Sequence, residues 1–122
     1  MEILSKILIG LVALEHLYIL YIEMFAWETI GKRTFKGSLK SEMFKPTKTL
    51  AANQGLYNGF LSVGLIWSLI IQDIEWSGYV SFFFLGCVIV AGAYGSVTAS
   101  RKIFFVQALP AIVAILVTYF AR

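Results

Sequence analysis

Four apolar runs occupy most of the sequence, and each of them predicts a helix. A helix needs about 20 mainly apolar residues to cross roughly 30 Å of hydrocarbon, and each run is close to that length. We expect spans at residues 3–27, 49–71, 78–99 and 103–121, with a basic loop at residues 28–48 between the first two. Residues 1–122 then form one all-α domain, a polytopic membrane protein built as a bundle of four transmembrane helices.

Two of these runs carry polar side chains that a lipid-facing helix would lack. The first contains Glu15, His16 and Glu23, and the second contains Asn53, Gln54, Tyr57 and Asn58. A charge at the centre of a bilayer costs roughly 2.5–3.5 kcal/mol even on the insertion scale, so such groups persist where they line a cavity or pair with each other. The pattern therefore predicts a bundle with a polar interior.

Composition supports a membrane protein and excludes several other classes. Hydrophobic residues make up 59% of the chain and charged residues 14%, whereas a soluble domain has about 45–50% and 25%. Cys87 is the single cysteine, which excludes an intramolecular disulfide and a cysteine-based metal site. His16 alone gives too few ligands for a usual transition-metal site, and no phosphate-binding loop or nucleophile motif is present. We expect no metal and no cofactor.

The basic residues predict the orientation of the chain. Eight of the ten Lys and Arg residues follow the first and third spans: Lys32, Arg33, Lys36, Lys40, Lys45, Lys48, Arg101 and Lys102. The positive-inside rule then places these loops in the cytoplasm and both termini outside the cell membrane. Because lipid headgroups and orientation explain this charge, it does not indicate nucleic acid. An apolar stripe at Phe35, Leu39 and Met43 fits a short interfacial helix, although an ordinary solvated loop explains it equally well.

The depth of the polar residues predicts a cavity open to the cytoplasm. With a rise of about 1.5 Å per residue, Glu15 and His16 lie near the midplane and Glu23 about 12 Å nearer the cytoplasm. His16 and Glu23 share a helix face, and Glu15 points about 80–100° away from it. The candidate cavity residues are Glu15, His16, Glu23, Asn53, Gln54, Tyr57, Asn58, Tyr94 and Gln107. The alternative is that such groups only join helices, at about 0.6 kcal/mol for each hydrogen bond, and for Gln107, Ser62 and Ser96 we favour this role.

Small residues predict close packing between helices. Gly55 and Gly59 form a GxxxG pattern, which allows two helix backbones to approach within a chain or between chains. Because four short spans bury little polar surface, we expect a homodimer in which these glycines offer a contact face. Pro110 is expected to kink the fourth span near its middle.

Several strings resemble one known family over essentially the whole chain. They are ALEHLYI at residues 13–19, EMFAW at 23–27, NQGLYNGF at 53–60, GCVIVAGAYG at 86–95 and RKIFFVQALPA at 101–111. These strings look like the DUF1304 family of small bacterial and fungal membrane proteins, a name that denotes unknown function. The resemblance implies a four-helix integral membrane protein. Some fungal relatives carry an "epoxidase subunit" label.

Three functions remain open from the sequence. The leading hypothesis is a transporter or efflux protein for a small molecule, either with or without coupling to protons. A membrane-embedded enzyme acting on a quinone, sterol or epoxide is the second, with Glu15, His16 and Glu23 as acid–base groups. The third is an accessory subunit of a membrane complex. The expected partners are membrane lipids, a small-molecule ligand and a second copy of the chain.

Overall fold

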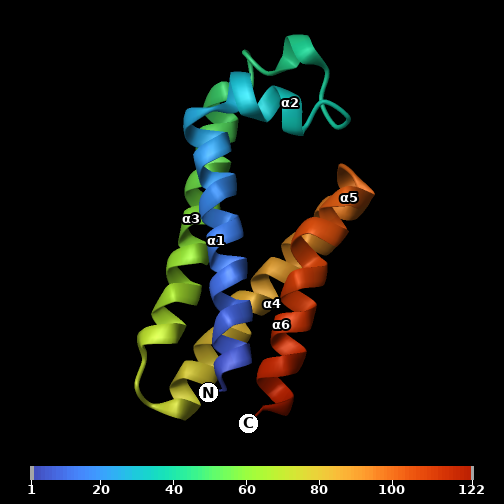
Figure 1. Ribbon diagram of the computed structural model, residues 1–122. Helices are drawn as coiled ribbons and strands as arrows, with labels where there is room; N and C mark the ends of the chain where they lie inside the picture. Colours follow the sequence, from blue (N-terminus) through green and yellow to red (C-terminus); the bar gives the residue numbers. More distant parts are fainter. Residues whose placement is uncertain (1, 122) are drawn as a thin grey trace.

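Four long helical segments form the molecule, and the basic loop covers one end of them (Figure 1). This computed structural model describes residues 2–121, which contain no β-strand. The long segments are α1 (Ile3–Phe25), α3 (Lys48–Ile70), α4 (Ile74–Thr98) and a continuous stretch of α5 (Arg101–Ile103), the π-helix η3 (Phe104–Ala108) and α6 (Leu109–Phe120). The loop contains the π-helix η1 (Trp27–Gly31), α2 (Lys32–Thr34) and the 3-10 helix η2 (Ser41–Met43). No continuous helix carries the apolar stripe predicted in this loop.

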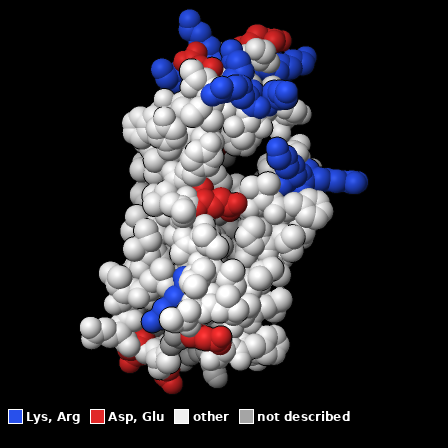
Figure 2. Space-filling view, in the orientation of Figure 1, with Lys and Arg blue, Asp and Glu red and all other residues white. Residues whose placement is uncertain are grey.

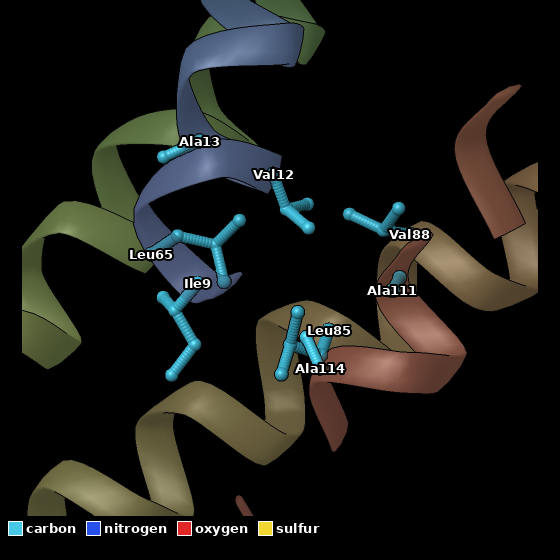
Figure 3. Packing of buried hydrophobic residues seen from close by; sticks show 8 residues of the cluster. All are labelled: Ile9, Val12, Ala13, Leu65, Leu85, Val88, Ala111 and Ala114. Atoms are coloured by element: carbon cyan, nitrogen blue, oxygen red, sulfur yellow. The ribbon is translucent and has the colours of Figure 1, made fainter. Parts of the chain in front are cut away.

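The hydrophobic core lies where α1, α3, α4 and α6 meet, in the half of the molecule that is distant from the basic loop (Figure 3). All four helices contribute aliphatic side chains to it: Ile9, Val12, Ala13, Leu65, Leu85, Val88, Ala111 and Ala114. Alanine on α6 lets that helix approach the larger side chains of α1 and α4. Along α1 this cluster ends at Ala13, so Glu15 lies at its edge on the side of the basic loop.

Glycines bring α1 and α3 into close contact along the half nearer the loop. A Cβ atom at Gly55 would lie 2.8 Å from the Cγ of Met24 and 3.0 Å from the Cβ of Glu23. A Cβ atom at Gly59 would lie 2.6 Å from a Cδ atom of Leu20. The GxxxG pattern is therefore used inside the chain, and these two glycines are not available as the homodimer contact face that the sequence suggested.

Small hydroxyl side chains also join the helices. The Ser62 hydroxyl donates to the Ala13 carbonyl at 2.7 Å, which is the interhelical role predicted for it. Ser96 instead donates to Ala93 on its own helix. In the half distant from the loop, the Ser5 and Thr118 hydroxyls hydrogen-bond each other between α1 and α6. Neither residue was a candidate from the sequence, so this contact was missed.

An aromatic cluster holds the basic loop against the ends of α1 and α3. The Trp27 ring packs 5.6 Å from Phe35 and 5.0 Å from Phe44, measured between ring centroids. The Trp27 indole N–H donates to the Thr47 hydroxyl at 3.0 Å. Phe44 is fully buried although it belongs to a loop. The loop is thus an ordered part of the fold and can contribute side chains to a binding site.

The structure supports a membrane protein. Charged side chains gather at the two ends, and the body between them is largely uncharged (Figure 2). Within residues 2–121, three helical stretches are long and apolar enough to cross a membrane: Ile3–Phe25, Ile74–Thr98 and Arg101–Phe120. The expected count of four spans is not matched, because α3 is not among these stretches. Its 23 residues would suffice in length, but its carboxamides lower its hydropathy. Arg122, expected at the end of the last span, lies outside the described residues.

Candidate functional site: a cavity between α1, the basic loop and the last helix

A cavity of about 190 Å³ lies on the side of α1 that faces α5 and η3. Its residues come from α1, from the loop around α2 and from the stretch that begins at Ser100: Glu15, Tyr18, Ile19, Ile22, Thr34, Phe35, Ser38, Ser100, Lys102, Ile103, Val106 and Gln107. Figure 2 shows the surface hollowed between the two groups of basic side chains. The cavity therefore lies toward the basic end, on the side of α1 that faces the last helix.

The last helix contributes Gln107 to this cavity through a π-helical turn. η3 spans Phe104–Ala108 and ends two residues before Pro110, which has no amide hydrogen for the regular helical ladder. Isolated π turns are often found at functional sites, because they shift the direction of side chains relative to a regular α-helix. Gly92 on α4 packs closely against Ala108, because a Cβ atom added to Gly92 would lie only 2.8 Å from the backbone nitrogen of Ala108. This contact holds the π turn against α4.

Glu15 lies at the inner end of the cavity and is only partly satisfied. Its Oε1 atom is buried and has no hydrogen-bond partner among the described residues. The nearest basic nitrogen is Nδ1 of His16 at 3.9 Å, and that atom already hydrogen-bonds the Val12 carbonyl at 2.9 Å. Buried polar atoms in native proteins nearly always have a partner, so a carboxyl oxygen of this kind requires an explanation. The Glu15 side chain as a whole is 26% exposed, so its rotation would bring this oxygen to a donor in the cavity.

Glu15 also lines a second hollow between α1 and the last helix, on the side of Glu15 that is away from the basic loop. This groove has a volume of about 350 Å³ and lies between α1 and α6. Its other residues are apolar: Leu8, Leu11, Val12, Pro110 and Val113. Leu11 and Val113 are exposed, so the groove faces the surface that lipid would cover. The Glu15 carboxyl group thus lies between the cavity beside the basic loop and an apolar groove.

The other ionisable residues of α1 lie on a different face. His16 and Glu23 are 1% and 4% exposed and point away from the cavity, as the 100° helical spacing requires. Asn58 donates to the Glu23 carboxyl group at 2.6 Å between α1 and α3. The alternative role predicted for such polar groups was to join helices by hydrogen bonds. His16 instead bonds its own helix, and Glu23 is the residue with an interhelical partner.

The remaining candidates from the sequence do not line this cavity. Asn53 and Gln54 are exposed, and Tyr57 and Tyr94 are 59% and 71% exposed on the outer faces of α3 and α4. Gln107 is the one candidate that joins Glu15 in the cavity. The face of α3 that meets α1 is packed too closely for a cavity, because Gly55 and Gly59 remove the space between the helices. A ligand-binding role for the exposed residues stays a prediction.

Several cavity residues were missed from the sequence, and some of them could have been found. Tyr18, Ile19 and Ile22 follow Glu15 at helical positions i+3, i+4 and i+7, the spacing of a single helix face. Following that spacing from Glu15, instead of from His16, would have located them. The residues from the loop and from α5 carry no such signal, because tertiary packing alone brings Ser38 and Lys102 to the cavity.

Comparison with known proteins identifies the family. Residues 10–119 match the family described as "Protein of unknown function (DUF1304)". The chain belongs to the DUF1304 family. A relative from Lactococcus lactis subsp. lactis (strain IL1403), described as "Uncharacterized protein YpaA", is 35% identical over 121 residues, covering 98% of this chain and 100% of the relative. No solved structure matches this chain. The DUF1304 match thus includes all the helices that form the cavity, and the chemistry must be argued from the site.

Proposed function

We propose that the protein is a transporter or efflux protein for a small molecule and that Glu15 is the central binding group. The observation that carries this proposal is the position of the Glu15 carboxyl group between two hollows, one toward the basic end and one toward the lipid-facing side of the α1–α6 seam. Transport requires a group that a substrate can reach from either side of a barrier. A single residue shared by two separate hollows fits that requirement.

The packing around Glu15 supports a barrier that can open. On one side the hydrophobic core closes the bundle, through Val12 on α1 and Ala111 on α6. On the other side the cavity is covered by the loop around Phe35. A hinge at the π turn of η3 would let α6 move against α1 and exchange access between the two hollows. Glu15 would keep its position during this motion, because the close glycine contacts hold α1 on α3.

The distribution of the acid–base groups favours transport over catalysis. An enzyme that used Glu15, His16 and Glu23 together would need all three near one substrate. Glu23 is buried against α3 with Asn58, and the cavity is lined by Glu15 without the other two. An accessory subunit, the third function considered, would not need a buried carboxyl oxygen beside a ligand-sized cavity.

We propose that α3 is the fourth span, that the membrane is the cell membrane and that the basic loops are cytoplasmic. α3 packs along α1 from the Gly55–Glu23 contact to the Ser62–Ala13 hydrogen bond, so the two helices share the same depth. The eight basic residues of the two loops support the orientation. An alkaline-phosphatase fusion at the C-terminus should be active, and a fluorescent cytoplasmic reporter there should be dark. The reverse pattern would overturn the orientation.

We also propose a homodimer, with the outer face of α4 as the contact surface. A shallow groove on this face includes Phe83, Gly86, Cys87 and Val90, and an added Cβ at Gly86 would meet nothing within 4 Å. A second helix could approach closely at such a position. A thiol-specific bifunctional cross-linker should join two chains through Cys87 in membranes. Monomers alone in that experiment and in native mass spectrometry would exclude this contact.

The transport proposal is tested by flux in proteoliposomes. A panel of amines, carboxylates and neutral aromatic compounds is offered to vesicles that contain the wild-type protein, Glu15→Gln or the matched variant Glu23→Gln. We expect at least one compound to accumulate with the wild-type protein and Glu23→Gln, but not with Glu15→Gln. Equal accumulation with all three proteins would show that Glu15 is not the transport site. Tight binding of a compound without any flux would favour an enzyme or accessory role.

A further inference from the structure

The two ends of the cavity have opposite chemistry. At the inner end are the Glu15 carboxyl group, whose Oε1 atom is buried without a partner among the described residues, and the Gln107 carboxamide, which can both donate and accept. At the outer end are the Lys102 ammonium group and the hydroxyls of Thr34, Ser38 and Ser100. An ammonium group donates hydrogen bonds and accepts none, and the hydroxyls can donate as well. The cavity therefore has a carboxyl group at its inner end and an ammonium group at its mouth.

The middle of the cavity is apolar and narrow. Ile19, Ile22, Phe35, Ile103 and Val106 contribute its sides. The volume of about 190 Å³ is little more than the ~150 Å³ of an engineered cavity that admits benzene, and it is below the roughly 300–1,000 Å³ of usual ligand pockets. Along α1, the seven residues from Glu15 to Ile22 span about 10 Å. These dimensions suit one ring with a short substituent at each end.

We infer that the cavity binds a compact molecule with a cationic amine at one end, a single apolar ring in the middle and an anionic group at the other end. This inference rests on the proposed function, because it names the substrate class of the same site. The amine donates to Glu15 at the inner end, and the anionic group pairs with Lys102 at the mouth. The ring replaces water against the aliphatic side chains between them.

Simpler ligands leave one end of the cavity unsatisfied. An apolar ring alone would leave the buried Glu15 oxygen without a donor, and an unsatisfied buried acceptor costs free energy. An anion alone would gain Lys102 at the mouth but bring no donor to Glu15. An amine alone would satisfy Glu15, but it would enter past the Lys102 charge without compensating it. Each half of the ligand therefore has its own residue, and the two contributions can be measured separately.

The test uses three matched probes: 4-(aminomethyl)benzoate, benzylamine and 4-methylbenzoate. The first has both charged groups, the second lacks the carboxylate and the third lacks the amine. Binding is measured by isothermal titration calorimetry at pH 7 with the full chain in phosphatidylcholine nanodiscs, and empty nanodiscs are subtracted. The proteins are wild type, Glu15→Gln, Lys102→Gln and the control Glu23→Gln, whose carboxyl group is buried outside the cavity.

We expect the wild-type protein to bind 4-(aminomethyl)benzoate most tightly. A charge-assisted hydrogen bond is strong enough that its loss should weaken binding about tenfold or more. Glu15→Gln should therefore weaken the two amine probes by that factor and leave 4-methylbenzoate within about twofold. Lys102→Gln should weaken the two carboxylate probes and spare benzylamine. Glu23→Gln should bind all three as wild type does.

Two results would overturn the inference. One is the absence of saturable binding of 4-(aminomethyl)benzoate to wild-type protein that unfolds cooperatively on heating. The other is an equal loss of affinity for all three probes in Glu15→Gln or in Lys102→Gln. Such a loss would indicate a general disturbance of the cavity, without separate sites for the amine and the carboxylate. Lys102 is exposed, so its substitution should not affect folding. Failure of binding alongside Glu15-dependent flux of another compound would reject the ligand class and retain the transport proposal.

Discussion

Replacing Gly92 by alanine should destabilise the fold, whereas the same change at Gly10 should not. Both glycines lie inside long helices, so alanine gains about 0.8–1 kcal/mol of helix propensity at either position. At Gly92 the new Cβ atom would lie 2.8 Å from the Cβ and 2.8 Å from the backbone N of Ala108. A backbone atom cannot rotate away, so α4 and η3 must separate. At Gly10 an added Cβ atom would meet nothing within 4 Å.

The shared propensity term cancels in the difference between the two variants. Overpacking costs typically 1–3 kcal/mol, so Gly92→Ala should be less stable than Gly10→Ala by about that amount. Relative to wild type, Gly10→Ala should be neutral or up to about 1 kcal/mol more stable. The assay is reversible unfolding in mixed micelles with increasing dodecyl sulfate, followed by far-ultraviolet circular dichroism. Equal free energies of unfolding for the two variants would refute the close α4–η3 contact that positions Gln107.

Two further substitutions test the contacts that fix α1 and the loop. Asn58→Ala removes the 2.6 Å hydrogen bond to the buried Glu23 carboxyl group and should lower the free energy of unfolding by about 1–3 kcal/mol. The matched control Asn53→Ala changes an exposed residue of the same helix and should stay within about 0.5 kcal/mol in the same unfolding assay. Trp27→Phe keeps an aromatic ring but loses the donation to Thr47, so the loop should exchange its amide hydrogens faster while the long helices do not. Unchanged exchange in the loop would argue against the aromatic cluster as its anchor.

The helices of this protein follow from its hydrophobic pattern, because apolar runs of span length have few alternatives. The predicted runs and the observed helices agree closely at α1 and α3, and the third helix begins earlier than expected, at Ile74 instead of residue 78. The Asp73 side chain accounts for that difference, since it accepts hydrogen bonds from the amides of Glu75 and Trp76 and caps the helix. A capping signal of this kind was readable from the sequence.

The location of the cavity could not be predicted in the same way. The sequence shows which face of α1 carries Glu15, but not which helix lies opposite that face. Polar composition suggested α3, whereas the glycines of α3 allow close packing and leave no cavity there. The opposite side is built by η3 and by loop residues such as Phe35, whose positions depend on contacts distant in sequence. Helix spacing identifies neighbours on one helix, and tertiary packing decides the rest.

The most direct test of transport is side-specific labelling of the cavity. The natural thiol is first removed by Cys87→Ser, and a cysteine is introduced by Gln107→Cys in the cavity. Oriented membrane vesicles are treated with a membrane-impermeant methanethiosulfonate reagent from one side at a time. Leu14→Cys is the control, because this residue lies beside Glu15 in sequence but is exposed on the outer surface, where lipid would exclude the reagent. Transport predicts that Gln107→Cys reacts from both sides and that Leu14→Cys reacts from neither. Reaction of Gln107→Cys from the side of the basic loops alone would contradict transport.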